Sequence, residues 1–117
     1  MINFLTETQT TLACAGQTEA DILFIGSEES GHECSWPEFQ TLANFDYDNG
    51  FGSHIVAEDL IIVCKNGCIL RRREYDGSEW WEVLKPFVAP KTKLVIHTLK
   101  GPHNCLAEIR ANYEIEH

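Results

Sequence analysis

The order of hydrophobic and polar residues predicts a helix at the start of the chain. The apolar positions of residues 3–15 fall on one helical stripe, and they are Phe4, Leu5, Leu12 and Ala15. Asn3 can cap the first turn, and Gly16 suits the left-handed position that follows a last turn. We therefore expect a helix over about 3–15.

A short strand and a second helix are predicted next. Residues 21–26, DILFIG, form an apolar run that ends at a glycine, which is typical of a buried strand. In the segment SWPE, Ser35 can accept a bond from the backbone three residues on, Glu38 can reach back, and Pro37 fits a first turn. This capping box predicts a helix over about 36–43, with an apolar side made of Trp36, Phe39 and either Leu42 or Ala43. Residues 44–58 have the composition of a loop.

From residue 59 onward the pattern indicates strands. The runs DLIIVCK, CILRRREY and SEWWEVL are separated by Asn66-Gly67 and by Asp76-Gly77, which are strong hairpin signals. Residues 59–85 are therefore predicted to form a central antiparallel meander. Residues 92–99 are expected to add a strand, and the strict alternation of apolar and polar residues over 107–116 favours another.

These elements define the expected fold class. It is α+β, a single domain over residues 1–117, with a mostly antiparallel sheet of about six strands and two helices. A chain of 117 residues is long enough to bury one core without disulfides or metals.

The piece CKNGC at 64–68 leaves two hairpin geometries open. With a two-residue turn at Asn66-Gly67, Cys64 opposes Ile69 and the two sulfurs lie on opposite faces of the sheet. With a three-residue loop and a left-handed Gly67, Cys64 opposes Cys68 and a bridge becomes possible. We expect the two-residue turn, because Asn-Gly is its preferred pair, and hence reduced thiols with Cys64 buried and Cys68 nearer water.

A metal-binding domain is an alternative hypothesis. The pool of ligands is Cys64, Cys68, His32, Cys34, His103 and Cys105. The C-x3-C spacing differs from the C-x2-C of zinc knuckles, and nothing in the sequence brings the other ligands together. No metal site and no cofactor are therefore predicted.

The segment EYDGSEWWE at 74–82 is the other candidate for chemistry. A two-residue turn at Asp76-Gly77 places Arg72 opposite Trp81 and Glu74 opposite Glu79, and facing carboxylates can raise one pKa. A three-residue turn would instead pair Arg72 with Glu82. Because no nucleophile or substrate pocket is recognisable, we expect no catalytic residues and no enzyme.

The charge is distributed unevenly. The net charge is −9, yet residues 1–64 hold eleven Asp or Glu and no Lys or Arg, so the remainder carries 9 − 7 = +2. A negative face would disfavour nucleic acid and membranes and attract a basic protein surface, although acidic residues also simply keep proteins soluble. Adjacent strand residues point to opposite faces, so one of Trp80 and Trp81 should be exposed as a contact residue. The predicted partner-binding residues are Glu28, Glu29, Glu33, Asp46, Asp48, Glu58, Asp59, Trp80 and Trp81.

The start of the chain, MINFLTETQTT, lacks the basic and apolar regions of a secretory signal. The longest apolar runs are far shorter than the ~18 residues of a membrane span. The expected location is the cytoplasm.

Four segments carry a resemblance. They are TEADILFIGS at 18–27, SWPEFQTLANFDYDNGFG at 35–52, the strand that begins DLIIV, and REYDGSEWWE at 73–82. Together they resemble a family of small, uncharacterised phage and prophage proteins, over about residues 10–85. The resemblance implies an origin and no catalytic residues.

The functional hypothesis combines this resemblance with the acidic first half. We expect a non-catalytic phage-type protein that binds a basic surface of a host protein in the host cytoplasm. Inhibition of a nucleic-acid-handling defence system, of the anti-CRISPR or anti-restriction type, is one such role, and a phage accessory protein without it is another.

Overall fold

The computed structural model describes residues 1–50, 54–101 and 105–116, with side chains described up to residue 111. The chain divides into two compact units, Met1–Phe87 and Val88–His117. The single domain expected from the sequence stays a prediction, because this division does not show which parts fold alone.

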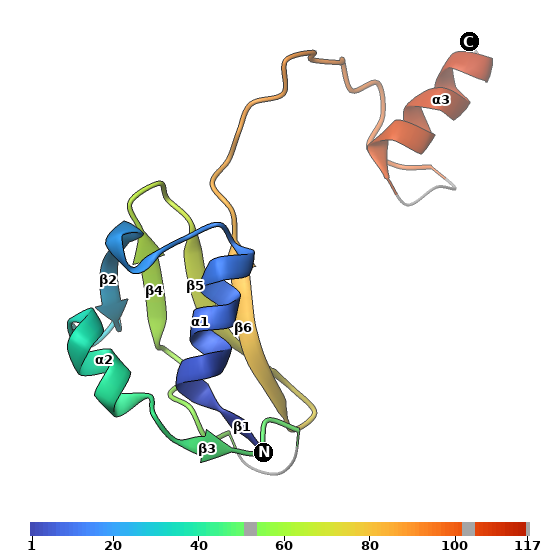
Figure 1. The fold of residues 1–117 in the computed structure, drawn as a ribbon. Coiled ribbons are helices and arrows are strands. Elements are labelled where there is room, and N and C mark those ends of the chain that lie inside the picture. Colours follow the sequence, from blue (N-terminus) through green and yellow to red (C-terminus); the bar gives the residue numbers. More distant parts are fainter. Residues whose placement is uncertain (51–53, 102–104, 117) are drawn as a thin grey trace. The chain divides into compact units, whose positions relative to one another are not determined.

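The first unit is α+β and is built on two antiparallel sheets (Figure 1). The larger sheet has the strand order β2-β4-β5-β6, and β1 pairs with β3 in the smaller one. A 3-10 turn at Glu19–Asp21 precedes β2. The other elements are β1 Ile2–Asn3, α1 Phe4–Cys14, β2 Ile22–Gly26, α2 Trp36–Leu42, β3 Asp46–Tyr47, β4 Ile61–Cys64, β5 Ile69–Tyr75 and β6 Ser78–Leu84.

Both predicted helices are confirmed, together with their caps. The Asn3 side chain accepts the Thr6 N–H at 3.0 Å, and Gly16 adopts the left-handed φ of 73° after α1. At α2, Ser35 accepts the Glu38 N–H and Glu38 accepts the Ser35 N–H, as the capping box requires. Of the apolar residues expected inside, Phe39 and Ala43 are buried, Trp36 is half-buried and Leu42 is exposed.

The meander β4-β5-β6 and its second turn are confirmed. Asp76 and Gly77 have φ of 51° and 85°, and Tyr75 pairs with Ser78 across them, so they form a two-residue turn. Arg72 therefore opposes Trp81 and Glu74 opposes Glu79.

The prediction for the first turn is wrong. Val63 pairs with Ile69, so Cys64 opposes Cys68 and the loop has three residues, with Gly67 at a φ of 94°. The Cys64 N–H donates to the Cys68 carbonyl at 2.8 Å, and the Asn66 side chain accepts the Cys68 N–H at 3.0 Å, which closes the longer loop. Cys68 is consequently buried, not nearer water.

The sheet has one buried face and one open face. Residues of β4, β5 and β6 that alternate along each strand join the core with α1, which lies across this face in Figure 1. They are Ile62, Cys64, Leu70, Arg72, Glu79 and Trp81. The opposite face carries Ile61, Val63, Ile69, Arg71 and Trp80, none of which is buried.

One side of β2 is closed by the chain that follows it. Gly26 bridges to Glu33, and the Cys34 N–H donates to the Ile25 carbonyl at 3.0 Å. A Cβ at Gly26 would lie 1.9 Å from the His32 carbonyl oxygen, so only glycine allows this close approach.

The second unit corrects two expected strands. Residues 92–99 form no strand, and the tail is the helix α3, Leu106–Glu116. The tail contains good helix formers, and its Ile109 N–H donates to the Cys105 carbonyl at 3.1 Å in a helical bond. A strand needs a pairing partner, whereas a helix satisfies its own backbone. The expected sheet of about six strands is therefore replaced by sheets of four and two.

No helix in the described part of the chain combines the length and the apolar character needed to cross a membrane.

Candidate functional site

The larger sheet contains a step where β5 is longer than β4. The last pair between them is Ile61 with Arg71, whereas β5 continues to Tyr75 and pairs there with β6 alone. In a two-residue hairpin the flanking pair is hydrogen-bonded, so Tyr75, Arg73 and Arg71 direct their backbone groups to β6. Arg72 directs its groups toward Leu60, the residue that precedes β4. Glu74 directs its groups to the side where β4 is missing, and in the described part of the chain no backbone bond to them is present there.

Two hollows lie along this step, and they share Glu58, Arg72 and Arg73. The first has a volume of about 250 Å³ and is lined by Glu28, Glu29, Glu58, Asp59, Ile61 and Arg71–Arg73. The second has about 290 Å³ and is lined by His54, Glu58, Arg72, Arg73 and Glu74.

The first hollow brings together four of the predicted partner-binding carboxylates. Glu28 and Glu29 follow the end of β2, and Glu58 and Asp59 precede the start of β4. Because β2 and β4 are antiparallel neighbours, these two points lie at the same end of the sheet. We call Glu28, Glu29, Glu58 and Asp59 the rim carboxylates; all are exposed.

The rim carboxylates are not paired with the arginines of the hollow. Each arginine of the hollow has another anion: Arg71 contacts Glu82 at 2.8 Å, Arg73 lies 3.6 Å from it, and Arg72 contacts Glu79 at 3.0 Å. Within the described part of the chain, no rim carboxylate makes an ion pair or side-chain hydrogen bond.

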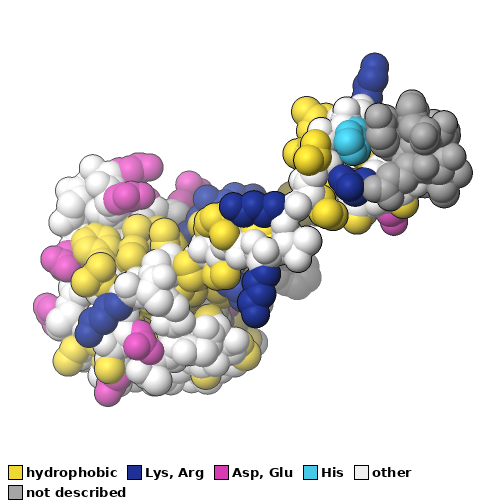
Figure 2. Space-filling model, turned by 90° about the horizontal axis from the view of Figure 1, so that it is seen from above, with side chains coloured by type: hydrophobic (Ala, Val, Ile, Leu, Met, Phe, Trp, Pro, Cys, Tyr) yellow, Lys and Arg dark blue, Asp and Glu magenta, His cyan; other side chains and the backbone are white. Residues whose placement is uncertain are grey.

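The other predicted acids lie outside this hollow. Glu33 is exposed on the segment that bridges to β2. Asp46 accepts from the Asn3 side chain at 3.2 Å, and Asp48 accepts the Gly50 N–H at 2.9 Å. On the face that Figure 2 shows, the Asp and Glu side chains are dispersed over the first unit and form no continuous patch.

The adjacent tryptophans divide between the two faces, as expected. Trp80 is 40% exposed on the open face of the sheet. Trp81 is 7% exposed and belongs to the core, where its indole N–H donates to the Thr8 hydroxyl at 2.9 Å. Of the pair, only Trp80 is available to a partner.

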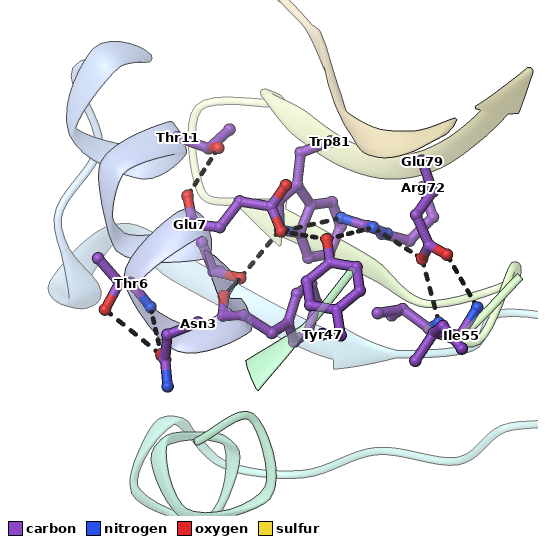
Figure 3. Close-up of polar contacts among 12 residues, drawn as sticks. Asn3, Thr6, Glu7, Thr11, Tyr47, Ile55, Arg72, Glu79 and Trp81 are labelled. Atoms are coloured by element: carbon purple, nitrogen blue, oxygen red, sulfur yellow. Dashed lines mark hydrogen bonds and ion pairs between the residues drawn. The ribbon is translucent and has the colours of Figure 1, made fainter. Parts of the chain in front are cut away.

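A polar network that the sequence did not reveal fills the core side of the step (Figure 3). The Arg72 guanidinium donates to Glu79 at 3.0 Å and to the Tyr47 hydroxyl at 3.1 Å, and Tyr47 in turn donates to Glu7 at 2.5 Å. The guanidinium carbon lies 5.0 Å from the ring centroids of both Phe4 and Trp81. A buried cation is held here by anions and aromatic rings together.

This network determines the protonation of Glu79. Burial alone raises the Glu79 pKa, but the N–H groups of Ile55 and Val56, the Arg72 guanidinium and the His54 charge outweigh it, and the net pKa is lowered. The raised pKa that facing carboxylates can produce in the Glu74–Glu79 pair is therefore not found at Glu79. Burial also raises the pKa of Tyr47, with a further contribution from the Glu7 carboxylate.

The cysteine pair lies on the same core face. Cys64 and Cys68 are each 1% exposed and are free thiols. Burial, followed by the proximity of Cys68, raises the pKa of Cys64 to about 11. A thiol with this pKa is scarcely ionised at neutral pH and is a poor nucleophile.

In the described ranges, no group of three or more His, Cys, Asp or Glu residues is arranged to hold a metal ion. His103, one of the predicted ligands, lies outside the described residues.

Comparison with family models, with curated proteins and with solved structures finds no match for this chain.

The sequence contained part of the signal for this site. The run of acids without cations located the rim carboxylates, and the Asp-Gly turn located Arg72 opposite Trp81. The step depends on where β4 begins, and the network joins residues from α1, β3, β5 and β6 that are far apart in the chain. No short-range pattern carries that information.

Proposed function

We propose that this chain is a non-catalytic protein-binding module that docks on a basic surface of its partner through the rim carboxylates. The observation that carries the proposal is the gathering of four unpaired, exposed carboxylates at one hollow whose arginines already have anionic partners. Exposed charges of this kind steer association and confer specificity.

The proposal does not use the facing carboxylates for acid–base catalysis. A general acid near neutral pH needs a raised pKa, whereas Glu79 has a lowered one and is bonded to Arg72 and two backbone N–H groups. Its position is that of a structural anion.

The finer part of the proposal is a phage origin, a host protein as partner, and action in the host cytoplasm. Inhibition of a nucleic-acid-handling defence enzyme suits an acidic module, because such enzymes present basic surfaces to nucleic acid. The resemblance of residues 18–82 to small phage proteins supports this origin.

The test compares two variants that each remove four negative charges. The rim variant combines Glu28→Gln, Glu29→Gln, Glu58→Gln and Asp59→Asn. The control variant combines Glu19→Gln, Glu33→Gln, Asp48→Asn and Asp76→Asn, all at exposed positions outside the first hollow. The immobilised proteins are exposed to a bacterial lysate at low salt, and captured proteins are identified by mass spectrometry and then purified for affinity measurement.

We expect a basic protein that binds the wild type and the control variant with similar affinity and binds the rim variant at least about tenfold more weakly. Four exposed ion pairs at ~0.2–1 kcal/mol each account for such a loss. Absence of any captured protein above background, or equal binding by the two variants, would contradict the proposal.

A further inference from the structure

We infer that the step in the sheet accepts an extended, basic segment of the partner, which pairs with β5 as an added strand beside Arg73–Tyr75. This inference rests on the proposed function and specifies the partner's chemistry and binding mode. The added strand would continue the line of β4 past Leu60, beside the part of β5 that pairs with β6 alone.

The first observation is a set of unused backbone groups. The N–H and C=O groups of Glu74 point to the side that β4 leaves free, and the described residues supply them no backbone partner, whereas Arg72 already faces Leu60. A strand edge of this kind is a template for β-addition, in which main-chain bonds supply affinity and alternate side chains supply specificity.

The second observation is the charge around that edge. The rim carboxylates border the same hollow as Arg72 and Arg73, so a strand paired there would bring its side chains within their reach. Lys or Arg at alternate positions would meet unpaired anions, whereas Asp or Glu would be repelled. The segment is therefore basic.

The third observation concerns Arg72, which lines both hollows. It is 5% exposed, and its Nε and Nη1 atoms have no hydrogen-bond partner, although Nη1 lies 3.7 Å from a Glu7 carboxylate oxygen. Buried donors without acceptors are costly. The Arg72 side chain has no exposed surface and lies 5.0 Å from the Phe4 and Trp81 ring centroids, so the segment does not reach these atoms; Arg72 instead fixes the core face of β5 next to the free edge.

The outer edges of the sheet fit such a segment less well. On β2, the bridge of Gly26 to Glu33 and the bond from Cys34 to Ile25 already cover the edge. On β6, the Glu79 N–H already donates to the Asn49 carbonyl at 2.8 Å. The rim carboxylates lie at the step and line neither of these edges.

The two hollows adjoin each other along one strand, an arrangement that suits successive residues of an extended chain.

The experiment uses the full chain and a fluorescent peptide of alternating lysine and valine. A second peptide has the same sequence with alternate backbone nitrogens methylated, which removes the N–H groups that face β5. On the protein side, Glu74→Pro removes one N–H on the free side of β5 and leaves the bonds to β6 in place, and Glu74→Ala is the matched control for the lost side chain. Circular dichroism verifies that both variants are folded.

We expect the unmethylated peptide to bind, with the methylated peptide and the Glu74→Pro variant each weakening binding by about tenfold relative to their controls. Amide exchange at Glu74 should slow when the peptide binds. Absence of peptide binding, equal binding by Glu74→Pro and Glu74→Ala, or protection at Trp81 and Val83 on β6 instead, would overturn the added strand.

Binding of the peptide to the rim variant distinguishes failure of the added strand from failure of the proposed function. If the peptide binds without backbone pairing but requires the rim carboxylates, the docking function stands and the added strand is wrong. If the rim variant binds the peptide as tightly as the wild type, the proposed function itself is wrong.

Discussion

The two hairpins of the meander begin from similar turn signals and end in different loops. Asp76-Gly77 forms a two-residue turn between β5 and β6, whereas Asn66-Gly67 belongs to a three-residue loop between β4 and β5. Either loop suits Asn-Gly, so the turn residues alone do not decide the register. The register is decided by which side chains must enter the core.

At the second hairpin the core requirement is specific. Arg72 and Trp81 face each other inside, where the guanidinium finds Glu79 and the indole finds Thr8. At the first hairpin both faces of β4 are apolar, and the observed register places Cys64 opposite Cys68 and Ile62 opposite Leu70 in the core. The same register ends the β4 pairing at Arg71 and so leaves the step.

Deleting one residue from each loop gives the largest expected contrast. Deletion of Lys65 leaves Cys64 and Cys68 facing each other across a two-residue Asn-Gly turn, so the register survives. The loss is the Lys65 N–H bond to the Asp21 carbonyl, worth about 1 kcal/mol.

Deletion of Asp76 forces β6 to slip by one residue and turns Trp81 and Glu79 to the outer face. We expect a loss of more than about 4 kcal/mol, since the buried Arg72–Glu79 pair is broken, Glu82 turns into the core and Trp80 replaces Trp81 there. Urea denaturation measures both proteins. Equal losses would show that register is not determined by the core residues of β6.

The two neighbouring arginines of β5 should differ in a similar way. Arg72→Ala leaves the Glu79 carboxylate buried without its cation and should cost about 3–5 kcal/mol. Arg73→Ala removes a half-exposed side chain 3.6 Å from Glu82 and should cost less than about 1 kcal/mol. Free energies of unfolding from urea titration give the comparison, and a loss of less than about 1 kcal/mol for Arg72→Ala would mean that the network does not stabilise the core.

Two threonines of α1 extend the comparison to single hydroxyls. Thr8→Val leaves the buried Trp81 indole N–H without an acceptor and should cost about 1–3 kcal/mol. Thr11→Val removes a half-buried hydroxyl that donates to the Glu7 carbonyl, and we expect a smaller loss. Thermal unfolding of the two variants measures which stability loss is larger. A larger loss for Thr11→Val would show that the hydroxyl outside the core contributes more to stability.

Acid should weaken the second hairpin through Glu79. Because its folded pKa is lowered, its contribution is present above the unfolded value of about 4.3 and is lost as pH falls through the folded pKa. The free energy of unfolding should therefore fall more steeply below about pH 4 in the wild type than in Glu79→Gln. The pKa values of Asp21 and Glu38 are also lowered, by bonds to Thr18 and Ser35. Both groups titrate in both proteins, so their contributions cancel in the comparison. Parallel curves would show that Glu79 is not the titrating group.

The elements that could be predicted are those with local signals. Capped ends located α1 and α2, and Asp-Gly with flanking alternation located β5 and β6 in register. Burial of Arg72 with Glu79 could not be predicted, because Tyr47 and Glu7 come from other elements and their contacts are long-range.

The errors have identifiable causes. The run LIIVC at β4 has no alternation, so it fits either hairpin register. In the tail, small and charged residues alternate but also form helices readily, and no strand was available for pairing. The rim carboxylates were found from composition, whereas their meeting point required knowing that β2 and β4 are neighbours.

The central claim is that β5 presents a free edge beside the rim carboxylates. Amide hydrogen exchange of the unbound protein, followed by NMR, tests it residue by residue. Leu70, paired with β4, and Arg73, paired with β6, should exchange only through opening of the sheet, whereas Glu74 should exchange at least ~100-fold faster. Protection of Glu74 equal to that of Leu70 would show that this edge is already occupied, and would contradict the account.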